Sequence, residues 1–535
     1  MKDSPARDIE DPRYIPHELL LTFTGPDILT QDDVRVERLH GMARMIVDGA
    51  SIEHAREHAR LQEQLDALQP ERSGGQSTAP GSGGQRPHLP MTRRLLLTPR
   101  RPSPNERDHV KVAVDRINSN LDGLRHGDVA IVSATPNWIL SSSSLGGPHN
   151  GPATIAGPIA GKGVWAFSRA EVAGSWQHLG QSTGAENVVV AVLDTWPGQD
   201  RLDWAAANLD NELMTTIRTM VVNGEIKVID PPAGAAPVPP RQTYAELDHG
   251  LFVTGIIHRI APSARFKVFH ILNEYGLGST DRLLSALRSC VELAHEYKQV
   301  GTRLVVNMSL YLMIPPDDAP ESLWDVWFAH HPEDNALAAQ DRASLVDKLA
   351  LAVEHYVDLL LDAGAVVVAA AGNDALAYGS AGHPDHLQPR MPADYDKVIC
   401  VVATNREGKI AEYSNRADVP MKGNCIATWG GEGVVSASPD NRGTVVVPSN
   451  GDGVVGLFTR PGMVMNQENK TGWVYWSGTS FATPIVSGLA AVLLGNDPTL
   501  TPRAVMARLY AMAQPSAETD PALGCPYIKV RQRRE

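Results

Sequence analysis

Four residues of the kinds that catalyse acyl transfer occur along this 535-residue chain, each at the start or the end of an apolar segment. Asp194 follows the apolar run Val188–Leu193, and His249 opens an apolar segment with glycines spaced for tight packing. Asn373 follows a third apolar run, and Ser480 occurs last. Each residue alone has an ordinary structural interpretation, such as a helix cap, a turn former or a structural histidine. Together, at the strand ends and helix tips of one domain, Ser480, His249 and Asp194 predict a nucleophile, its base and a carboxylate, and Asn373 lies at a corresponding strand end.

The most specific of these signals surrounds Ser480, within the stretch Ser477–Pro484. Gly478 leaves room for a close approach of the backbone, and Pro484 fits the first turn of a helix, where its missing N–H costs nothing. The residues that follow, through Leu494, carry no charge, so we expect a buried helix. A serine at the tip of such a helix is positioned as a nucleophile, because the helix dipole favours negative charge beside it.

Apolar runs of strand length recur along the chain and indicate the fold class. They are Val188–Leu193, Arg265–Ile271, Leu304–Met308, Ala365–Ala371 and Val398–Ala403. Continuous apolar runs are typical of strands that are buried on both faces of a parallel sheet. Helical stretches such as Asp281–Tyr297 and Arg342–Ala363 separate them. This alternation predicts an α/β domain with a mostly parallel central sheet between helices, whose active site lies beyond the carboxyl ends of the strands.

Composition and charge limit the function classes. Hydrophobic residues make up 43% of the chain and charged residues 20%, as in ordinary globular proteins. The net charge of -13 argues against a nucleic-acid-binding surface. The N-terminal residues Met1–Asp8 lack the apolar stretch of a signal peptide, and no apolar run is long enough to cross a bilayer. We therefore expect a cytoplasmic protein without nucleic-acid or membrane partners, with secretion by another route left open.

The four cysteines, Cys290, Cys400, Cys425 and Cys525, are scattered and show no metal-ligand spacing. We expect them to be small buried hydrophobes, most clearly Cys400, because it lies inside an apolar run. No metal site is predicted, and the chemistry suggested by the four polar residues requires no cofactor.

Stretches rich in proline, glycine and serine divide the chain into domains. The expected parts are a disordered N-terminus at 1–10, a small α+β domain at 11–140 with a flexible insertion at 70–92, a linker at 141–163, a catalytic domain at 164–515 and a solvated C-terminal tail at 516–535. In the small domain we expect strands at Tyr14–Phe23 and Val129–Ala134, and helices within Asp32–Leu68 and Val110–Leu124.

The motifs around the polar residues resemble those of the subtilisin-like serine proteases, the subtilases or peptidase family S8. The matching stretches are Val192–Thr195, His249–Gly250 with Val253 and Gly255, Ala370–Asn373 and Gly478–Pro484, with Met391–Ala393 and Tyr413–Asn415 also similar. The resemblance covers about residues 171–513, and the order Asp, His, Asn, Ser is taken from the family. It implies a subtilisin-like three-layer fold and a serine endopeptidase that acts on protein or peptide substrates.

The resemblance also implies a catalytic role for each residue. Ser480 would attack the scissile carbonyl, and His249 would carry the serine's proton to the leaving amine. Asp194 would fix the histidine tautomer and stabilise the imidazolium. Asn373 would donate to the oxyanion together with the backbone N–H of Ser480.

Substrate-binding residues follow from the same resemblance. Ser309 and Leu310 are similar to the strand that pairs with the substrate backbone, and Tyr311 and Gly372 complete the expected set. The family usually has glycine where Tyr311 stands, so the preferred substrate side chain is not carried over. Family members often bind structural calcium, but no calcium-loop pattern stands out in this sequence.

Some positions depart from the family's pattern without removing a catalytic group. Trp196 replaces the usual glycine after Asp-Thr, and Leu251 replaces the usual threonine after His-Gly. The stretches 199–244 and 430–476 are longer than in a minimal subtilase, and we expect them to form surface loops.

The end of the small domain has a weaker resemblance of its own. Ala134–Ile139 is similar to the end of a subtilase propeptide, although Thr135 stands where an acidic residue is common. The resemblance implies that residues 11–140 act as an intramolecular inhibitor and that cleavage within 141–163 releases it. An unrelated α+β accessory domain is the alternative.

Two function hypotheses remain. The first is an active endopeptidase, and the second is a catalytically silent subtilase-fold protein that holds a peptide or a regulatory partner. The four intact catalytic positions favour the enzyme, and labelling of Ser480 by a fluorophosphonate separates the two.

Overall fold

The structure, a computed structural model, describes most of the chain. The described residues are 14–26, 29–30, 32–67, 89–98, 109–141, 153–154, 157–158, 165–168, 184–231, 246–313, 339–373, 375, 388–416, 423–437, 444–448, 452–459, 463–464, 467–515 and 520–534. The predicted disordered N-terminus and most of the predicted insertion at 70–92 lie outside them. The chain divides into a larger unit, Trp138–Trp327 and Val353–Glu535 with the first residues, and a smaller unit, Tyr14–Asn137 and Phe328–Ala352.

The larger unit is built on an eight-stranded sheet in the order β23-β16-β15-β14-β12-β8-β10-β9, and all neighbouring strands are parallel. The strands are β8 (Val188–Asp194), β9 (Ile226–Ile229), β10 (Arg265–His270), β12 (Arg303–Met308), β14 (Val366–Ala370), β15 (Ile399–Thr404), β16 (Cys425–Trp429) and β23 (Tyr527–Ile528). The central strands are buried along their length, which explains why their sequences are continuous apolar runs. The predicted mostly parallel α/β sheet is confirmed.

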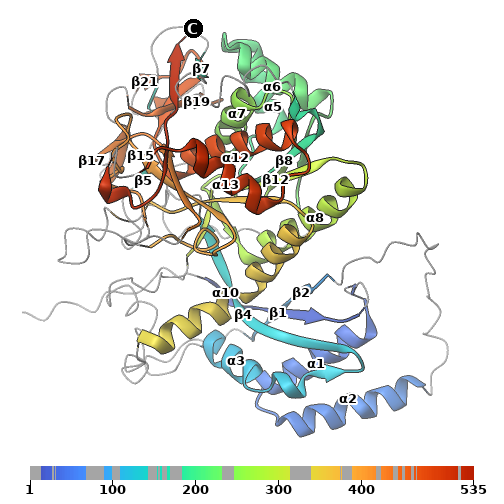
Figure 1. The fold of residues 1–535 in the computed structure, drawn as a ribbon. Coiled ribbons are helices and arrows are strands. Elements are labelled where there is room, and N and C mark those ends of the chain that lie inside the picture. The colour runs from blue at the N-terminus through green and yellow to red at the C-terminus, as the bar shows by residue number, and fades with distance from the viewer. Residues whose placement is uncertain are drawn as a thin grey trace, which may run out of the picture. The chain divides into compact units, whose positions relative to one another are not determined.

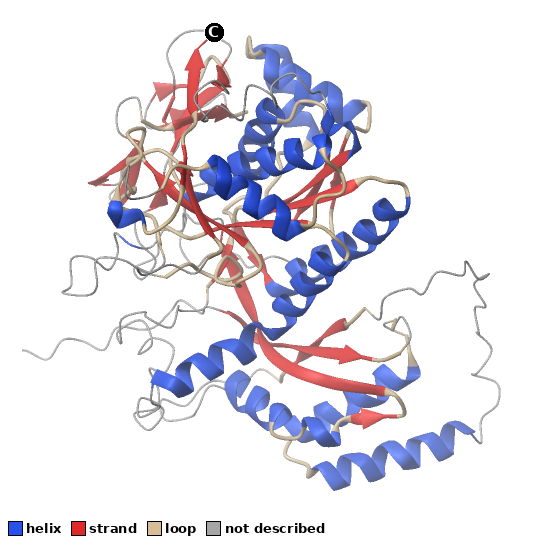
Figure 2. Ribbon diagram, viewed as in Figure 1, coloured by secondary structure: helices blue, strands red, loops and turns tan. Residues whose placement is uncertain are grey.

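Helices cover both faces of this sheet (Figure 1). On one face α7 (His249–Ile260) packs against α12 (Thr479–Asn496), and α13 (Pro502–Met512) packs beside α12. On the other face α8 (Thr280–Gln299) packs on β8 and β12 (Figure 2). Another long helix, α10 (Ala339–Asp362), precedes β14.

Helix α12 is buried, as its sequence predicts. All of its residues from Thr479 to Leu494 are buried, because the helix is apolar on every side. Among the described residues it is the one helix long and apolar enough to cross a membrane, and 89% of it is buried inside the protein.

The two long stretches that we expected as surface loops are largely regular structure. Within 199–244 the described residues form α5 (Gln199–Asn208), α6 (Glu212–Val222) and β9. Within 430–476 they form β17 (Gly433–Ala437), β18 (Thr444–Pro448), β19 (Val454–Leu457), β20 (Met463–Val464), β21 (Gln467–Glu468) and β22 (Trp473–Trp476). The loop expectation is wrong there because apolar side chains such as Leu202 and Val454 join the main hydrophobic core.

The smaller unit combines a small sheet with helices, as predicted. Its strands are β1 (Tyr14–Thr24), β2 (Met91–Leu96), β3 (Arg125–His126) and the first part of β4 (Val129–Ser141), and its helices are α1 (Val34–Val47), α2 (Ile52–Ala67) and α3 (His109–Asn118). β1 lies between β2 and β4, with Leu19, Leu20 and Leu21 fully buried. The predicted insertion ends two residues too late, because Met91 and Thr92 already pair with β1.

Two segments that we expected to lack regular structure contribute strands to the larger unit. In the predicted linker, β5 (Ala153–Thr154) pairs with β18, and β6 (Gly157–Pro158) pairs with β22. In the predicted tail, β23 forms an edge of the main sheet, and β24 (Arg531–Arg534) pairs with β7 (Trp165–Ser168). The solvated tail is a wrong prediction, because Tyr527 and Ile528 are buried against β16.

Candidate active site

Asp194 and His249 meet at the carboxyl edge of the main sheet. Asp194 is the last residue of β8, and His249 is the first residue of α7. Nδ1 of His249 donates to Oδ1 of Asp194 at 2.7 Å, and the backbone N–H of Thr195 donates to the same oxygen at 2.7 Å. The His249 and Asp194 side chains are 1% and 0% exposed. Since Nδ1 carries the proton shared with Asp194, Nε2 is the ring nitrogen that can accept another.

The surroundings of His249 favour its protonated form. Burial opposes protonation, but the charge of Asp194 and the hydrogen bond to it outweigh burial, so the pKa of His249 is raised. Nε2 has no hydrogen-bond partner within the part of the chain that the structure describes. The rings of Trp476 and Phe481 surround the imidazole, with centroids 5.6 and 5.2 Å away. A buried acceptor left open in this way suits a general base.

Ser480 lies in the first turn of α12. Its Oγ donates to the backbone carbonyl of Ser309 at 3.2 Å, and Oγ of Ser309 donates to the backbone carbonyl of Ser480 at 2.8 Å. The structure therefore ties Ser480 to Ser309, and Nε2 of His249 makes no hydrogen bond to Ser480. The next residue, Phe481, contacts the His249 ring. Catalytic hydrogen bonds often tighten only when substrate is bound.

Asn373 follows β14 and lies against the residue that precedes Ser480. Its Oδ1 accepts from the backbone N–H of Thr479 at 2.9 Å and from the Thr479 hydroxyl at 2.8 Å. These bonds engage the carbonyl oxygen and turn the amide nitrogen away from Thr479. A Cβ on Gly478 would stand 3.1 Å from that nitrogen, so glycine there leaves room for the amide group. The structure thus brings Asn373 to the Ser480 turn, while its contact with an oxyanion stays a prediction.

Gly372 holds the turn that presents Asn373. Its φ of 111° is left-handed, and a Cβ there would lie 2.9 Å from Nδ2 of Asn415 and 3.0 Å from Cγ of Arg390. Its backbone N–H donates to Oγ1 of Thr479 at 3.3 Å. Both the conformation and the space therefore require glycine at this position. A contact with substrate, which the sequence predicts for Gly372, stays a prediction.

The predicted substrate-binding stretch lies beside a strand of the chain itself. β13 (Tyr311–Leu312) follows Ser309 and Leu310, and β11 (Leu277–Ser279) precedes α8. Residues Ile139–Ser141 of β4 pair antiparallel with β11, and Leu140 and Ser141 also pair antiparallel with β13, so that Ser141 lies opposite Tyr311 on one side and opposite Leu277 on the other. These residues of β4 belong to the larger unit, so the three-stranded arrangement is internal to it.

The Tyr311 ring is buried in this arrangement. Its exposed fraction is 1%, and the guanidinium of Arg390 lies 5.2 Å from the ring centroid. An aromatic side chain and a cation therefore occupy the place where the family usually has glycine.

Thr195, which the sequence analysis gives only as the last residue of the motif Val192–Thr195, links the elements that carry Asp194 and His249. Its Oγ1 accepts from the backbone N–H of Gly250 at 3.0 Å and donates to the backbone carbonyl of Leu247 at 3.0 Å. It therefore ties the end of β8 to the start of α7 and fixes the distance between Asp194 and His249. Its place directly after Asp194 was the only sequence signal.

Tyr413 supports the Ser480 turn from the other side. Its hydroxyl lies within hydrogen-bonding distance of the carbonyls of Gly430 and Gly431, at 3.1 and 2.6 Å. The Gly430 carbonyl also accepts from the backbone N–H of Gly478 at 3.0 Å. The buried phenol thus anchors the loop on which the start of α12 rests.

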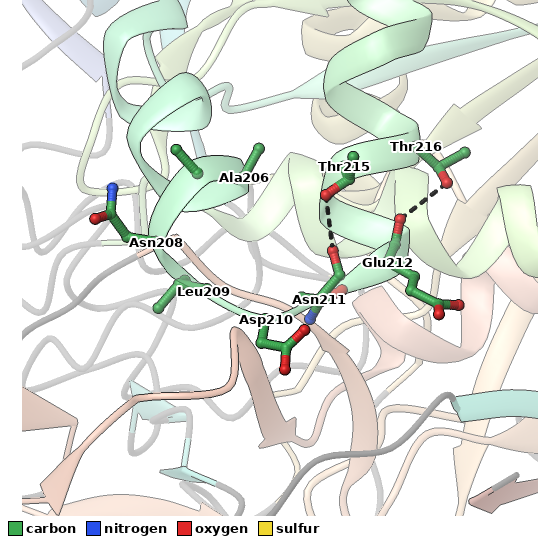
Figure 3. Close-up of a pocket in the computed structure, with 9 residues that line it drawn as sticks. Ala206, Asn208, Leu209, Asp210, Asn211, Glu212, Thr215 and Thr216 are labelled. Carbon is green, nitrogen blue, oxygen red and sulfur yellow. Dashed lines mark hydrogen bonds between the residues drawn. The ribbon is translucent and has the colours of Figure 1, made fainter.

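A separate hollow lies at the connection between α5 and α6 (Figure 3). Asp210, Asn211 and Glu212 line it, and the Thr215 and Thr216 hydroxyls beside it donate to backbone carbonyls of the preceding turn. None of the predicted site residues lines this hollow. In the described ranges, no group of three or more His, Cys, Asp or Glu side chains could hold a metal ion.

Comparison with known sequences agrees with these motifs. The profile of the subtilase family, Peptidase_S8, matches residues 185–525. Mycosin-4 of Mycobacterium tuberculosis is 30% identical over 274 residues, which is 49% of this chain and 46% of that protein. Subtilisin-like protease 11 of Trichophyton verrucosum is 25% identical over 260 residues, which is 48% of this chain and 44% of that protein. The chain therefore spans about half the length of the curated relatives it matches.

Solved structures were compared as well. The match to the prenylagaramide maturation protease PagA covers 65% of this chain and 93% of that chain, with 22% sequence identity and a TM-score of 0.37. The match to a lanthipeptide protease covers 64% of this chain and 85% of that chain, with 17% sequence identity and a TM-score of 0.39.

Proposed function

Because the chain belongs to the subtilase family, we propose that it is a serine endopeptidase that cleaves protein or peptide chains through Asp194, His249 and Ser480. The observation that carries the proposal is the buried hydrogen bond of 2.7 Å between His249 and Asp194, with Nε2 of His249 open beside the start of α12. A cytoplasmic location stays a prediction of the sequence.

The proposed reaction needs one rotation of the serine side chain. Oγ of Ser480 leaves the carbonyl of Ser309 and turns to Nε2 of His249, which takes its proton while Oγ attacks the scissile carbonyl. The imidazolium formed is stabilised by Asp194, in agreement with the raised pKa of His249. His249 then gives the proton to the leaving amine, and water cleaves the acyl-enzyme by the same route. No step of this reaction requires a cofactor.

We propose that Asn373 stabilises the oxyanion together with the backbone N–H of Ser480. The two hydrogen bonds from Thr479 to Oδ1 fix the plane of the amide and support this role. Asn373→Ala should lower kcat by about 10²- to 10³-fold and leave KM nearly unchanged, because the contact strengthens in the transition state. Steady-state kinetics measure both constants, and Asn208→Ala on α5 is the control. An equal loss of peptide binding would contradict the role.

Active-site labelling tests the enzyme against the silent binding protein. A fluorophosphonate should modify Ser480, as mass spectrometry of the labelled peptide will show, and Ser480→Ala should remain unlabelled. Labelling is measured on the full chain and again after any self-cleavage. A wild-type protein that binds peptides but is neither labelled nor able to cleave them would support the binding protein instead.

We further propose that the N-terminal part of the chain controls the site. Support comes from Leu140 and Ser141, which pair with Tyr311 and Leu312 of β13, directly after Ser309 and Leu310, the residues that the sequence predicts to pair with the substrate backbone. Cleavage within 141–163, most of which lies outside the described residues, would free this position. The wild type should yield a fragment that begins between Ser141 and Val164, whereas Ser480→Ala should stay at full length. If intact mass spectrometry finds both uncut and the wild type still cleaves peptides, the segment is an accessory module.

A further inference from the structure

A buried amide interrupts the apolar strand β12. Asn307 is 0% exposed, and its neighbours in the register are Val192 on β8 and Val368 on β14. Burying an amide among apolar strands costs free energy unless hydrogen bonds compensate for the lost water. The hydrogen-bond partners of Asn307 therefore indicate its role.

The Asn307 side chain joins α12 to the residues that follow β12. Oγ of Ser487 on α12 donates to Oδ1 of Asn307 at 2.8 Å, and Nδ2 of Asn307 donates to Oγ of Ser309 at 3.1 Å. Oγ of Ser309 donates in turn to the backbone carbonyl of Ser480 at 2.8 Å. All four side chains are 0% exposed. We call Ser487, Asn307, Ser309 and Ser480 the polar row.

The polar row starts and ends on one face of α12. Ser480 and Ser487 are seven residues apart on this helix, close to two turns of about 3.6 residues each, and α12 packs on β12. Every bond of the row donates in the same direction, from Ser487 toward the Ser480 carbonyl. Hydrogen bonds that run in one direction through a dry interior reinforce one another. The row therefore holds the start of α12 in one arrangement relative to β12.

We propose that Asn307 is a positioning residue for the reaction at Ser480, an inference that rests on the proposed function. Asn307 acts through Ser309, because its amide occupies the Ser309 hydroxyl as an acceptor while that hydroxyl donates to the Ser480 carbonyl. The Ser309 carbonyl accepts from Oγ of Ser480 at 3.2 Å. These contacts set the distance between the nucleophile and the stretch Ser309–Leu310, which the sequence predicts to pair with the substrate backbone.

A purely structural role for Asn307 leads to a different expectation. If the amide only satisfied its neighbours, replacing both Asn307 and Ser487 by apolar side chains would restore the fold and the activity together, because no buried group at that end of the row would lack a partner. If Asn307 positions Ser309, the same double replacement restores stability but not the rate. Asn307→Leu combined with Ser487→Ala makes this comparison.

Asn307→Ala should lower kcat by about 10- to 10²-fold and keep KM within about threefold, because a misplacement of about 1 Å costs about 10²-fold in rate. The loss falls on kcat since the backbone edge that would bind substrate is still present. The rate constant for fluorophosphonate labelling of Ser480 should fall by a similar factor, because the reagent reacts with Oγ and needs no strand to pair with. The double variant should regain Tm while kcat stays low.

Asn424→Ala is the matched control. Asn424 is 2% exposed, and its Nδ2 donates to the backbone carbonyls of Tyr395 and Val398 at 2.9 and 3.1 Å. It directly precedes β16 and so lies at the amino end of that strand, whereas the candidate site lies beyond the carboxyl ends. This variant should lose Tm and keep kcat within about threefold of the wild type.

The full chain of each protein is used, and intact mass spectrometry establishes that the compared proteins are in the same state of self-cleavage. Steady-state cleavage of a fluorogenic peptide gives kcat and KM, and thermal unfolding gives Tm. If Asn307→Ala does not fold, the double variant makes the comparison with Asn424→Ala.

A wild type that is neither labelled nor able to cleave peptides would refute the proposed function and this inference with it. With an active wild type, three results would each overturn the inference alone. They are a kcat of folded Asn307→Ala within about threefold of Asn424→Ala, a raised KM with unchanged kcat, and a double variant that regains kcat together with Tm.

Discussion

Gly250→Ala should disable the active site through one added methyl group. Gly250 follows His249 at the start of α7, and a Cβ at this position would stand 2.0 Å from the backbone oxygen of Thr195 and 3.0 Å from Cβ of Asp194. Contacts below 3.0 Å essentially never occur at a real Cβ, so α7 and the end of β8 must separate by about 1 Å. The crowding falls on backbone atoms, which have no rotamer to relieve it.

The size of the loss follows from the Asp194–His249 contact. A separation of about 1 Å stretches the 2.7 Å hydrogen bond between them beyond the range of hydrogen bonds. Misplacement by about 1 Å costs about 10²-fold in rate, and complete loss of the aspartate's control of the tautomer costs about 10⁴-fold. We therefore expect kcat/KM to fall by about 10²- to 10⁴-fold.

The matched control is Gly255→Ala on the same helix. Its nearest neighbours would be side-chain atoms of Leu457 at 3.4 Å, an ordinary contact, and alanine is the better helix former by about 1 kcal/mol. We expect this variant to keep its activity and its stability. Cleavage of a fluorogenic peptide gives kcat/KM for both variants, and circular dichroism with thermal unfolding establishes that both are folded. A folded Gly250→Ala protein with kcat/KM within tenfold of Gly255→Ala would refute the reasoning.

The other predictions concern charge and protonation. Asp194→Asn should lower kcat by about 10⁴-fold with little change in KM, because the amide no longer holds the proton on Nδ1 of His249; steady-state kinetics that find a loss below tenfold would contradict this. Burial raises the pKa of Glu432 to about 7, and Glu412 and Asp452 add to the shift. Since the folded pKa lies above the unfolded one, this stabilisation is complete below about pH 4.5 and is lost as the pH rises to about 7. Glu432→Gln should therefore flatten the fall in Tm between pH 5 and 8 seen in the wild type, and identical pH profiles for the two proteins would be the contrary result.

The elements that position the predicted catalytic residues could be predicted because their signals are local. A strand buried on both faces, such as β8, is a continuous apolar run, and the residue after such a run lies at the carboxyl edge of the sheet. The glycine-led turn before α12 and its uncharged helix are equally local. The contact between Asp194 and His249 can be expected once the sheet is known to be parallel, because polar residues at the carboxyl ends of the strands then lie at one edge. The orientation of the Ser480 hydroxyl toward Ser309 does not follow, because it depends on side-chain packing around one rotatable bond.

The remaining features depend on pairing between residues far apart in the chain. The place of Cys400 opposite Cys425 arises from the register of β15 and β16, and nothing in the local sequence of either residue marks the other as its neighbour. β9 and β23 are short strands without long apolar runs, so the sequence predicts a surface loop at the first segment and a solvated tail at the second. Pairing energy from a neighbouring strand outweighs weak local preference at such positions.

The pairing of Ile139–Ser141 with β11 and β13 has a consequence for mass action. A tethered segment acts at an effective concentration in the millimolar range, and dilution of the protein does not lower it. If the freed segment binds with a Kd of about 1 μM, the tether weakens the apparent affinity of any peptide that needs the same two edges by about 10³-fold. One cut in the chain replaces that fixed concentration with the concentration of the protein itself. If the proposed cleavage within 141–163 occurs, the competitor leaves at nanomolar protein, and a single hydrolysed bond would change the two edges from self-paired to available.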